Sequence, residues 1–130
     1  MVAHDLNALP PGVAAFLGER HLATLTTLRA DGSPHLVAVG FSYDAAARLV
    51  RVITFARSVK AGNARRGGRA AVCQIDGRRW LTLEGVASVT DDATRVAAAV
   101  AGYAARYRQP GERADRVAIE IAVDKIIGNA

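Results

Sequence analysis

Apolar and polar residues alternate with a period of two along several short stretches of the chain. Because successive side chains of a strand point to opposite faces of a sheet, this period predicts half-buried strands. Asp31-Gly32 and Asp76-Gly77 are hairpin turn signals between such stretches. The pattern predicts six strands, over residues 21–29, 34–43, 48–55, 69–75, 80–89 and 116–123.

Three segments interrupt this alternation and are predicted to be helices. Residues 9–18 contain two prolines directly after Leu9, which a first helical turn tolerates, and end at a glycine. Residues 57–66 form a shorter helix closed by two glycines. A longer helix is predicted to be capped by Thr90 or Asp91, and one apolar stripe follows along it: Val96, Val100, Tyr103 and Tyr107.

The predicted fold is mostly β, a six-stranded antiparallel barrel in a single domain covering residues 1–130. Short antiparallel strands in so short a chain favour closure, since a closed barrel leaves no exposed edges. Residues 36–41 are apolar on both faces, yet a barrel has only one interior. We therefore expect a second copy of the chain to cover the outer apolar face, giving a homodimer.

Composition narrows the possible partners. Hydrophobic residues make up 51% of the chain and charged residues 22%, which is typical of an ordered globular protein. The net charge of +5 favours anionic ligands. Nucleic acid is not expected, because aromatic residues are only 5% and do not interleave with the basic ones. Cys73, the single cysteine, is predicted to be a small buried residue and excludes an internal disulfide.

The pattern also argues against membranes and metals. No stretch approaches the ~18 consecutive apolar residues of a membrane span, and the first residues lack the basic-then-apolar run of a signal peptide. The expected location is cytoplasmic. Three scattered histidines provide no ligand spacing, so no metal site is predicted. Paired catalytic carboxylates, nucleophile motifs and glycine-rich dinucleotide or phosphate loops are also missing.

The segment from Thr54 to Asn63 is the remaining candidate for chemistry. A strand ends at its start and a helix begins near Ser58, so a hydroxyl, backbone N–H groups and the Lys60 ammonium surround one helix N-terminus. Such a terminus favours phosphate. Lysine is rare in this arginine-rich chain, which draws attention to Lys60. In the alternative interpretation Ser58 only caps the helix and Lys60 is exposed to solvent, and the spacing alone does not decide.

The order of these features resembles the pyridoxamine-phosphate-oxidase-like split β-barrels. The resemblance rests on collinear phrases: the Asp31-Gly32 turn and Pro34 strand, Arg48-x-Val-x-Val-Ile-Thr, Ser58-x-Lys-x-x-Asn, Arg79-Trp-Leu-x-Leu-Glu-Gly and the closing Val117-Ala-Ile-Glu-Ile. Within that superfamily the chain resembles the actinobacterial coenzyme F420-dependent reductases, and among them the biliverdin reductases. Phrases shared with that group include Phe16-Leu-x-Glu-Arg-His-Leu-Ala, Val37-Ala-Val-Gly-Phe and Tyr103-Ala-x-Arg-Tyr-Arg.

The resemblance implies an FMN-binding-like, homodimeric split barrel with a particular set of cofactor contacts. Ser58 and Lys60 would hold a cofactor phosphate, with Val59 beside them and Thr54 and Asn63 assisting. The backbone of His35, Leu36, Val37 and Ala38 would run along the ring of the cofactor. Arg79 and Trp80 would reach the cofactor or substrate from the partner subunit, although Trp80 can equally serve only to pack the dimer. No catalytic acid is identified.

The cofactor implied is coenzyme F420, with FMN as the alternative. F420 continues beyond its phosphate into an oligoglutamate tail, and four arginines near the predicted phosphate site can pair with its carboxylates: Arg57, Arg65, Arg66 and Arg69. They can equally form a solvated helix face. The implied activity is hydride transfer from the reduced deazaflavin to a conjugated acceptor, with biliverdin to bilirubin as the leading case. The alternative is an FMN-binding oxidoreductase or flavin carrier.

Overall fold

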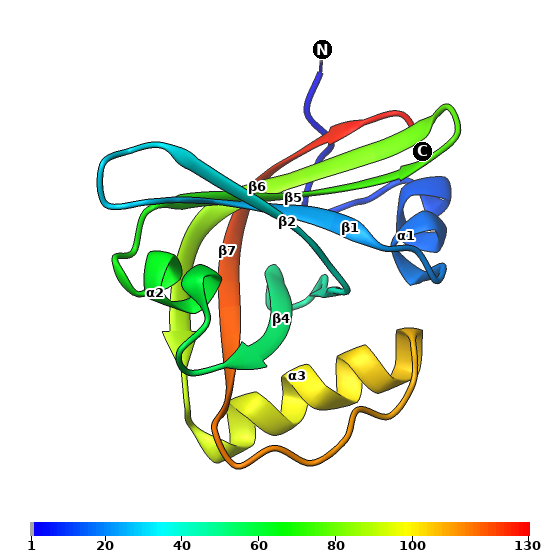
Figure 1. Cartoon of the computed structure of the whole chain (residues 1–130). Helices are drawn as coiled ribbons and strands as arrows, with labels where there is room; N and C mark the ends of the chain where they lie inside the picture. Colours follow the sequence, from blue (N-terminus) through cyan, green and yellow to red (C-terminus); the bar gives the residue numbers. More distant parts are fainter. Residues whose placement is uncertain (1) are drawn as a thin grey trace.

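The structure is a computed structural model that describes residues 2–130. Within that range the chain forms one antiparallel sheet and three helices (Figure 1). The strands are neighbours in the order β2-β1-β5-β6-β7-β4-β3. The elements are α1 (Pro11–Gly18), β1 (Ala23–Leu28), β2 (Pro34–Val39), β3 (Ser42–Asp44), β4 (Leu49–Phe55), α2 (Val59–Arg65), β5 (Arg69–Asp76), β6 (Arg79–Thr90), α3 (Ala93–Arg106) and β7 (Arg116–Gly128).

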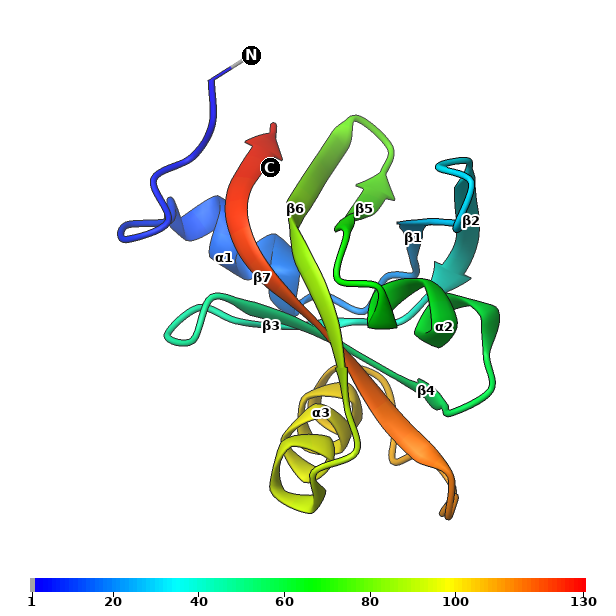
Figure 2. The same cartoon turned by 90° about the vertical axis from the view of Figure 1, so that its left-hand side faces the viewer.

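The two longest strands, β6 and β7, connect two halves of the curled sheet. The first part of β6 pairs with β5, whereas the first part of β7 pairs with β4. Both strands bend between these halves, so that β1, β2 and β5 lie across β4 and β7 (Figures 1 and 2). The residues buried between the halves form a continuous apolar core, which includes Leu25, Val72, Leu83, Ile119 and Ile121. The predicted mostly β, antiparallel barrel with short helices is confirmed.

The bend in the long strands coincides with an irregularity in their pairing. Glu84 pairs with Lys125 and Gly85 with Val123, so Asp124 is an extra residue on β7. A side chain on Gly85 is impossible here, because its Cβ would lie 1.9 Å from the backbone oxygen of Ala122. An extra residue in one strand bends it and increases the local twist. The bulge therefore directs β7 from one half of the barrel into the other.

The prediction of six strands is wrong: the described residues contain seven. The predicted strand over residues 34–43 is divided into β2 and β3 at Gly40 and Phe41. A Cβ on Gly40 would meet the rings of Tyr103 and Tyr107 at 2.9–3.1 Å, and the backbone N–H of Phe41 donates to Tyr107 Oη over 3.3 Å. Side chains of α3 and of the residue that follows it thus replace strand pairing at this point, and β2 and β3 become the two edges of the sheet.

Other boundaries differ by smaller amounts. β7 continues to Gly128 rather than ending at Val123, because the bulge allows pairing with β6 to resume after Asp124. The long helix is capped by the side chain of Asp92, which accepts the Arg95 N–H, and not by Thr90 or Asp91. Cys73 is only half-buried, since it lies on the outer face of β5 between the buried Val72 and Gln74.

Candidate functional site

A cavity of about 310 Å³ lies between the end of β2, the end of β4, α2, α3 and the segment before β7. Three of the predicted site residues line it: Ala38, Thr54 and Lys60. The other lining residues are Val39, Gly40, Val52, Ile53, Phe55, Tyr103, Pro110, Arg113 and Arg116. Because this lining holds three cationic side chains and no carboxylate, the cavity favours an anionic ligand.

Lys60 is the second residue of α2 and is half-buried, not exposed to solvent as in the alternative interpretation. Its ammonium makes no hydrogen bond or ion pair with any residue in the range 2–130. Burial lowers the pKa of the Lys60 ammonium below its usual range, because removal from water disfavours the charged form. An anion bound next to Lys60 would offset that cost, so the side chain is well placed as an anion ligand.

The Ser58 hydroxyl lies beside the cavity and caps α2. Its Oγ accepts the backbone N–H of Ala61 over 3.2 Å, and the Thr54 hydroxyl donates to the same oxygen over 3.0 Å. Both side chains are almost fully buried. The capping contact of the alternative interpretation is therefore present. The O–H of Ser58 has no acceptor among residues 2–130, because both contacts use its oxygen as acceptor, but Ser58 does not itself line the cavity.

The β2 strand presents an unpaired backbone edge next to this cavity. Strand β2 pairs only with β1, from Pro34 opposite Leu28 to Val39 opposite Ala23. Every second N–H and C=O group of an edge strand points away from its single neighbour. The backbone of residues 35–38 can therefore supply donors and acceptors along one line, as a flat heterocycle requires. In addition, Nδ1 of His35 is buried and has no hydrogen-bond partner among residues 2–130.

Asn63 does not join the cavity that contains Lys60. Its Nδ2 donates to Thr27 Oγ1 over 3.0 Å, and its Oδ1 accepts from Arg66 over 2.6 Å. Asn63 lines a separate hollow of about 180 Å³ on the side of α2 that faces β1. These contacts fix α2 against the sheet, which is a structural role that the spacing of Ser58, Lys60 and Asn63 did not predict.

Arg79 and Trp80 stand at the start of β6, outside the cavity. Arg79 donates to both oxygens of Glu19 over 2.9 Å and to Asp76 over 2.5 Å, and its guanidinium lies 4.5 Å from the ring centre of Phe16. These carboxylates raise the pKa of the Arg79 guanidinium. Within one chain, Arg79 is thus held in a fixed position by its own neighbours.

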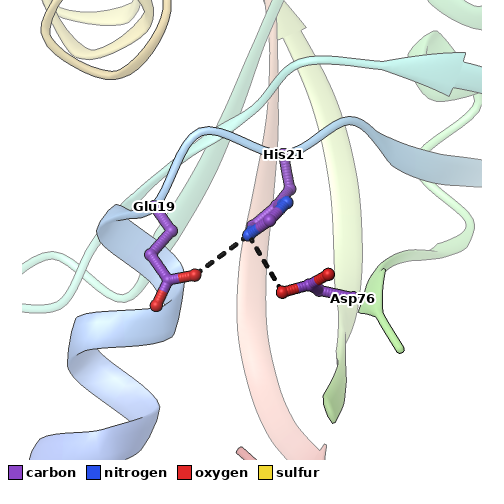
Figure 3. Close-up of side chains that lie close together, drawn as sticks. All are labelled: Glu19, His21 and Asp76. Atoms are coloured by element: carbon purple, nitrogen blue, oxygen red, sulfur yellow. Dashed lines mark hydrogen bonds and ion pairs between the residues drawn. The ribbon is translucent and has the colours of Figure 1, made fainter. Parts of the chain in front are cut away.

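The same two carboxylates also surround His21 (Figure 3). The Nε2 atom of His21 lies 3.0 Å from Glu19 and 3.7 Å from Asp76. A histidine with two carboxylates is a possible metal-ligand set. Here, however, both carboxylates are already paired with Arg79. The arrangement is best described as an ion-pair network that positions Arg79, and sequence analysis missed it because its members are far apart along the chain.

The four arginines expected near an acidic tail have different environments. Arg69 forms an ion pair with Asp124 and another with Glu84 at 3.6 Å. Arg66 donates to the Leu28 carbonyl and to Asn63. Arg57 and Arg65 are exposed and make no ion pair within residues 2–130. Of the four, only Arg69 has its charge compensated by a carboxylate of residues 2–130, and Arg57 and Arg65 are in addition free of side-chain hydrogen bonds within that range.

Comparison with known proteins identifies the family to which the chain belongs. The family model of pyridoxamine 5'-phosphate oxidase matches residues 9–129, and the chain belongs to this family. A curated relative from Mycobacterium tuberculosis (strain CDC 1551 / Oshkosh), described as an F420H(2)-dependent biliverdin reductase, is 53% identical over 129 residues, which cover 99% of this chain and 94% of the relative.

Solved structures agree with this assignment. A protein described as an F420 reductase is 25% identical, with a TM-score of 0.74, and the match covers 92% of this chain and 98% of that one. The conserved hypothetical protein Rv2991 from Mycobacterium tuberculosis is also 25% identical, with a TM-score of 0.77 over 93% of this chain and 84% of that one. The expected split-barrel family is therefore confirmed. No helix within residues 2–130 is both long enough and apolar enough to cross a membrane.

Proposed function

We propose that this protein is a coenzyme F420-dependent reductase that converts biliverdin to bilirubin. The structural observation that carries the proposal is the Lys60 ammonium, half-buried and without a counter-ion in a cavity beside the free edge of β2. The strong similarity to a relative of that described activity supports the choice of cofactor and substrate.

The residues present fit a phosphorylated heterocycle. Lys60 and the Ser58 hydroxyl would take the phosphate, with Thr54 holding the Ser58 oxygen in place. The edge of β2 would hydrogen-bond the ring, and the buried Nδ1 of His35 offers one further polar contact. When bound in its reduced form, the deazaflavin supplies a hydride to an electron-poor carbon of the acceptor. The protein then contributes orientation, charge stabilisation and the exclusion of water.

The acidic tail of F420 would extend from Lys60 toward Arg57 and Arg65. Both guanidinium groups are exposed and free of ion pairs in the described range, and Arg65 lines a hollow of about 410 Å³. Guanidinium groups bind carboxylates through paired hydrogen bonds as well as through charge. F420 is therefore preferred over FMN, because FMN ends at its phosphate and has no carboxylates that could pair with Arg57 and Arg65.

The active form is proposed to be a homodimer. On the outer face of the sheet, Leu36 is 62% exposed and Ile75 is 59% exposed. Trp80 lies opposite Ile75 and therefore shares this face. A partner that covers the face would bury these side chains and bring Trp80 to the partner's cavity, whereas Arg79 stays paired with Glu19 and Asp76 of its own chain. Sedimentation analysis tests this. Leu36→Asp should yield monomers, whereas Val2→Asp, at an exposed valine outside the sheet, should not.

One assay tests the activity. The purified protein is mixed with reduced F420 and biliverdin, and the appearance of bilirubin is followed by absorbance. Bilirubin formation that requires both protein and F420 supports the proposal. A protein that retains FMN after purification and shows no affinity for F420 would instead favour the flavin-binding alternative. Absence of binding to either cofactor would refute both.

A further inference from the structure

Arg116 occupies a position that three separate hollows share. It lines the cavity of about 310 Å³ that contains Lys60, an adjoining groove of about 550 Å³ along α3, and the hollow of about 410 Å³ that contains Arg65. It is the first residue of β7 and lies directly opposite Phe55, the last residue of β4. Since α2 begins shortly after Phe55, Arg116 and Lys60 approach the same cavity from different elements.

The Arg116 guanidinium has no partner of its own. It forms no hydrogen bond and no ion pair with residues 2–130, although it is half-buried. The neighbouring carboxylate, Asp115, is directed elsewhere: Arg113 Nε binds one of its oxygens at 2.5 Å and Arg113 Nη2 the other at 3.4 Å. Arg113 also lies 4.3 Å from the ring centre of Phe55. Arg113 and Asp115 therefore neutralise each other, and Arg116 is left as an uncompensated cation.

The surroundings of Arg116 suit a ligand that combines a carboxylate with an apolar body. The adjoining groove is lined on the α3 side by Val96 and Val100. Two carboxylates, Asp91 and Glu112, also line that groove, but neither pairs with Arg116. The inner cavity has no carboxylate in its lining. An anionic group is therefore favoured on the inner side of Arg116, with the apolar part of the ligand extending along α3.

We propose that Arg116 is a carboxylate-binding residue of this cavity. The Arg116 guanidinium holds one anionic group of the bound ligands, while Lys60 holds another. The inference rests on the proposed function, because that function supplies two sources of carboxylate, the propionates of a tetrapyrrole and the glutamate tail of the cofactor. A guanidinium binds either of them through a planar pair of N–H donors, which an ammonium cannot reproduce.

The test compares Arg116→Gln with Arg108→Gln, which removes the same charge from an exposed arginine that lines none of these hollows. Four dissociation constants are measured by spectroscopic titration: those of F420 with its glutamates, of F420 without them, of biliverdin, and of biliverdin dimethyl ester. Thermal unfolding verifies that both variants are folded. In Arg116→Gln, loss of a charge-assisted hydrogen bond should raise the dissociation constant of the ligand whose carboxylate Arg116 binds by about tenfold or more.

The outcomes separate the two sources. A selective loss of biliverdin affinity, with the ester unaffected, assigns the propionate to Arg116. A selective loss for the glutamate-bearing cofactor assigns the tail. Arg116→Lys should restore only part of the lost affinity in either case. The inference is overturned if Arg116→Gln binds every ligand as Arg108→Gln does, or if the charged and uncharged ligands lose affinity equally.

Failure of the proposed function is recognised separately. If the wild-type protein binds F420 and reduces biliverdin while Arg116→Gln is unchanged, only the assignment of Arg116 falls. If the wild-type protein binds neither F420 nor biliverdin, the proposed function falls, and the assignment of Arg116 falls with it.

Discussion

Arg106 donates a hydrogen bond of 2.6 Å from Nη1 to the backbone oxygen of Phe41, joining the end of α3 to the connection between β2 and β3. The same guanidinium donates from Nε to the carbonyl of Glu19 over 2.8 Å and from Nη2 to the side chain of Gln74. It is only 8% exposed, and burial lowers its pKa. One buried side chain thus connects α3 to the end of α1, to β5 and to Phe41, the residue after Gly40 in the cavity lining.

Replacing Arg106 should therefore cost substantial stability. Arg106→Ala leaves the buried oxygens of Phe41 and Gln74, and the partly buried oxygen of Glu19, without this donor. Each unsatisfied group costs about 1–3 kcal/mol, so the free energy of unfolding should fall by about 3 kcal/mol or more. Denaturant titration measures the change. The exposed Arg108→Ala serves as the control and should stay within about 0.5 kcal/mol of wild type. Equal stability of the two variants would contradict the role given to Arg106.

The sequence predicted the strands correctly where the alternation within one strand determines its structure. The prediction was wrong where residues far along the chain determine where a strand ends. Alternation predicted β6 and the first part of β7 because their faces differ in polarity along the strand itself. The break at Gly40 was missed because its cause, the rings of Tyr103 and Tyr107, lies at the C-terminal end of α3, more than 60 residues further along the chain. Arg106 was overlooked for a similar reason. Helical periodicity favours an apolar buried face, and only the three-dimensional contacts show that an arginine is buried there.

The candidate site was predictable to a similar extent. Lys60 could be singled out because lysine is rare and follows a strand-to-helix junction, and the structure places it in a cavity. Asn63 shares the same short motif, yet its side chain is directed to Thr27. Arg116 carried no signal in an arginine-rich chain. Its importance depends on the pairing of Asp115 with Arg113, which sequence spacing does not reveal.

Lys60 should show opposite effects on binding and on stability. Because burial lowers its pKa in the folded state, the ammonium destabilises the fold at pH values below that pKa. Lys60→Met should thus melt no lower than wild type at pH 7, while F420 affinity falls about tenfold or more through loss of a charge-assisted contact. The unfolded protein holds this proton more tightly, so the stability difference should shrink as pH rises toward 10.5.

The control for this prediction is Lys125→Met, at the only other lysine of the chain, which is exposed. That variant should bind F420 as wild type does. A loss of melting temperature in Lys60→Met with unchanged F420 affinity would show that Lys60 serves packing and not ligand binding.

Glu19 should make the stability of the protein depend on acid pH. Hydrogen bonds from Arg79 and His21 lower the pKa of Glu19 from 4.5 to about 2. A carboxylate with a lowered pKa stabilises the fold at pH values above its unfolded pKa, and this contribution is lost as the pH falls from 4.5 to about 2. Glu19→Gln should therefore melt below wild type at pH 7, and the two curves should converge near pH 2.

A matched variant separates this effect from general acid denaturation. Glu112 is exposed and makes no hydrogen bond or ion pair with residues 2–130. Melting curves of Glu112→Gln should follow wild type across the same pH series. A constant difference between Glu19→Gln and wild type at every pH would indicate that the side-chain shape, and not the charge, is responsible.

Two glycines that face very different surroundings provide the last prediction. Adding a Cβ at Gly40 brings it within 2.9–3.1 Å of the rings of Tyr103 and Tyr107, whereas nothing lies within 4 Å of the corresponding position at Gly62 in α2. Gly40→Ala must displace two rings at the cavity wall, and overpacking of this kind costs about 1–3 kcal/mol. Gly62→Ala should stabilise the protein by about 0.5–1 kcal/mol, since alanine is the better helix former. Denaturant titration without ligand should show these opposite signs. A Gly40→Ala variant as stable as Gly62→Ala would mean that the two tyrosine rings can move aside at no cost. Close packing of these rings would then not explain the break between β2 and β3.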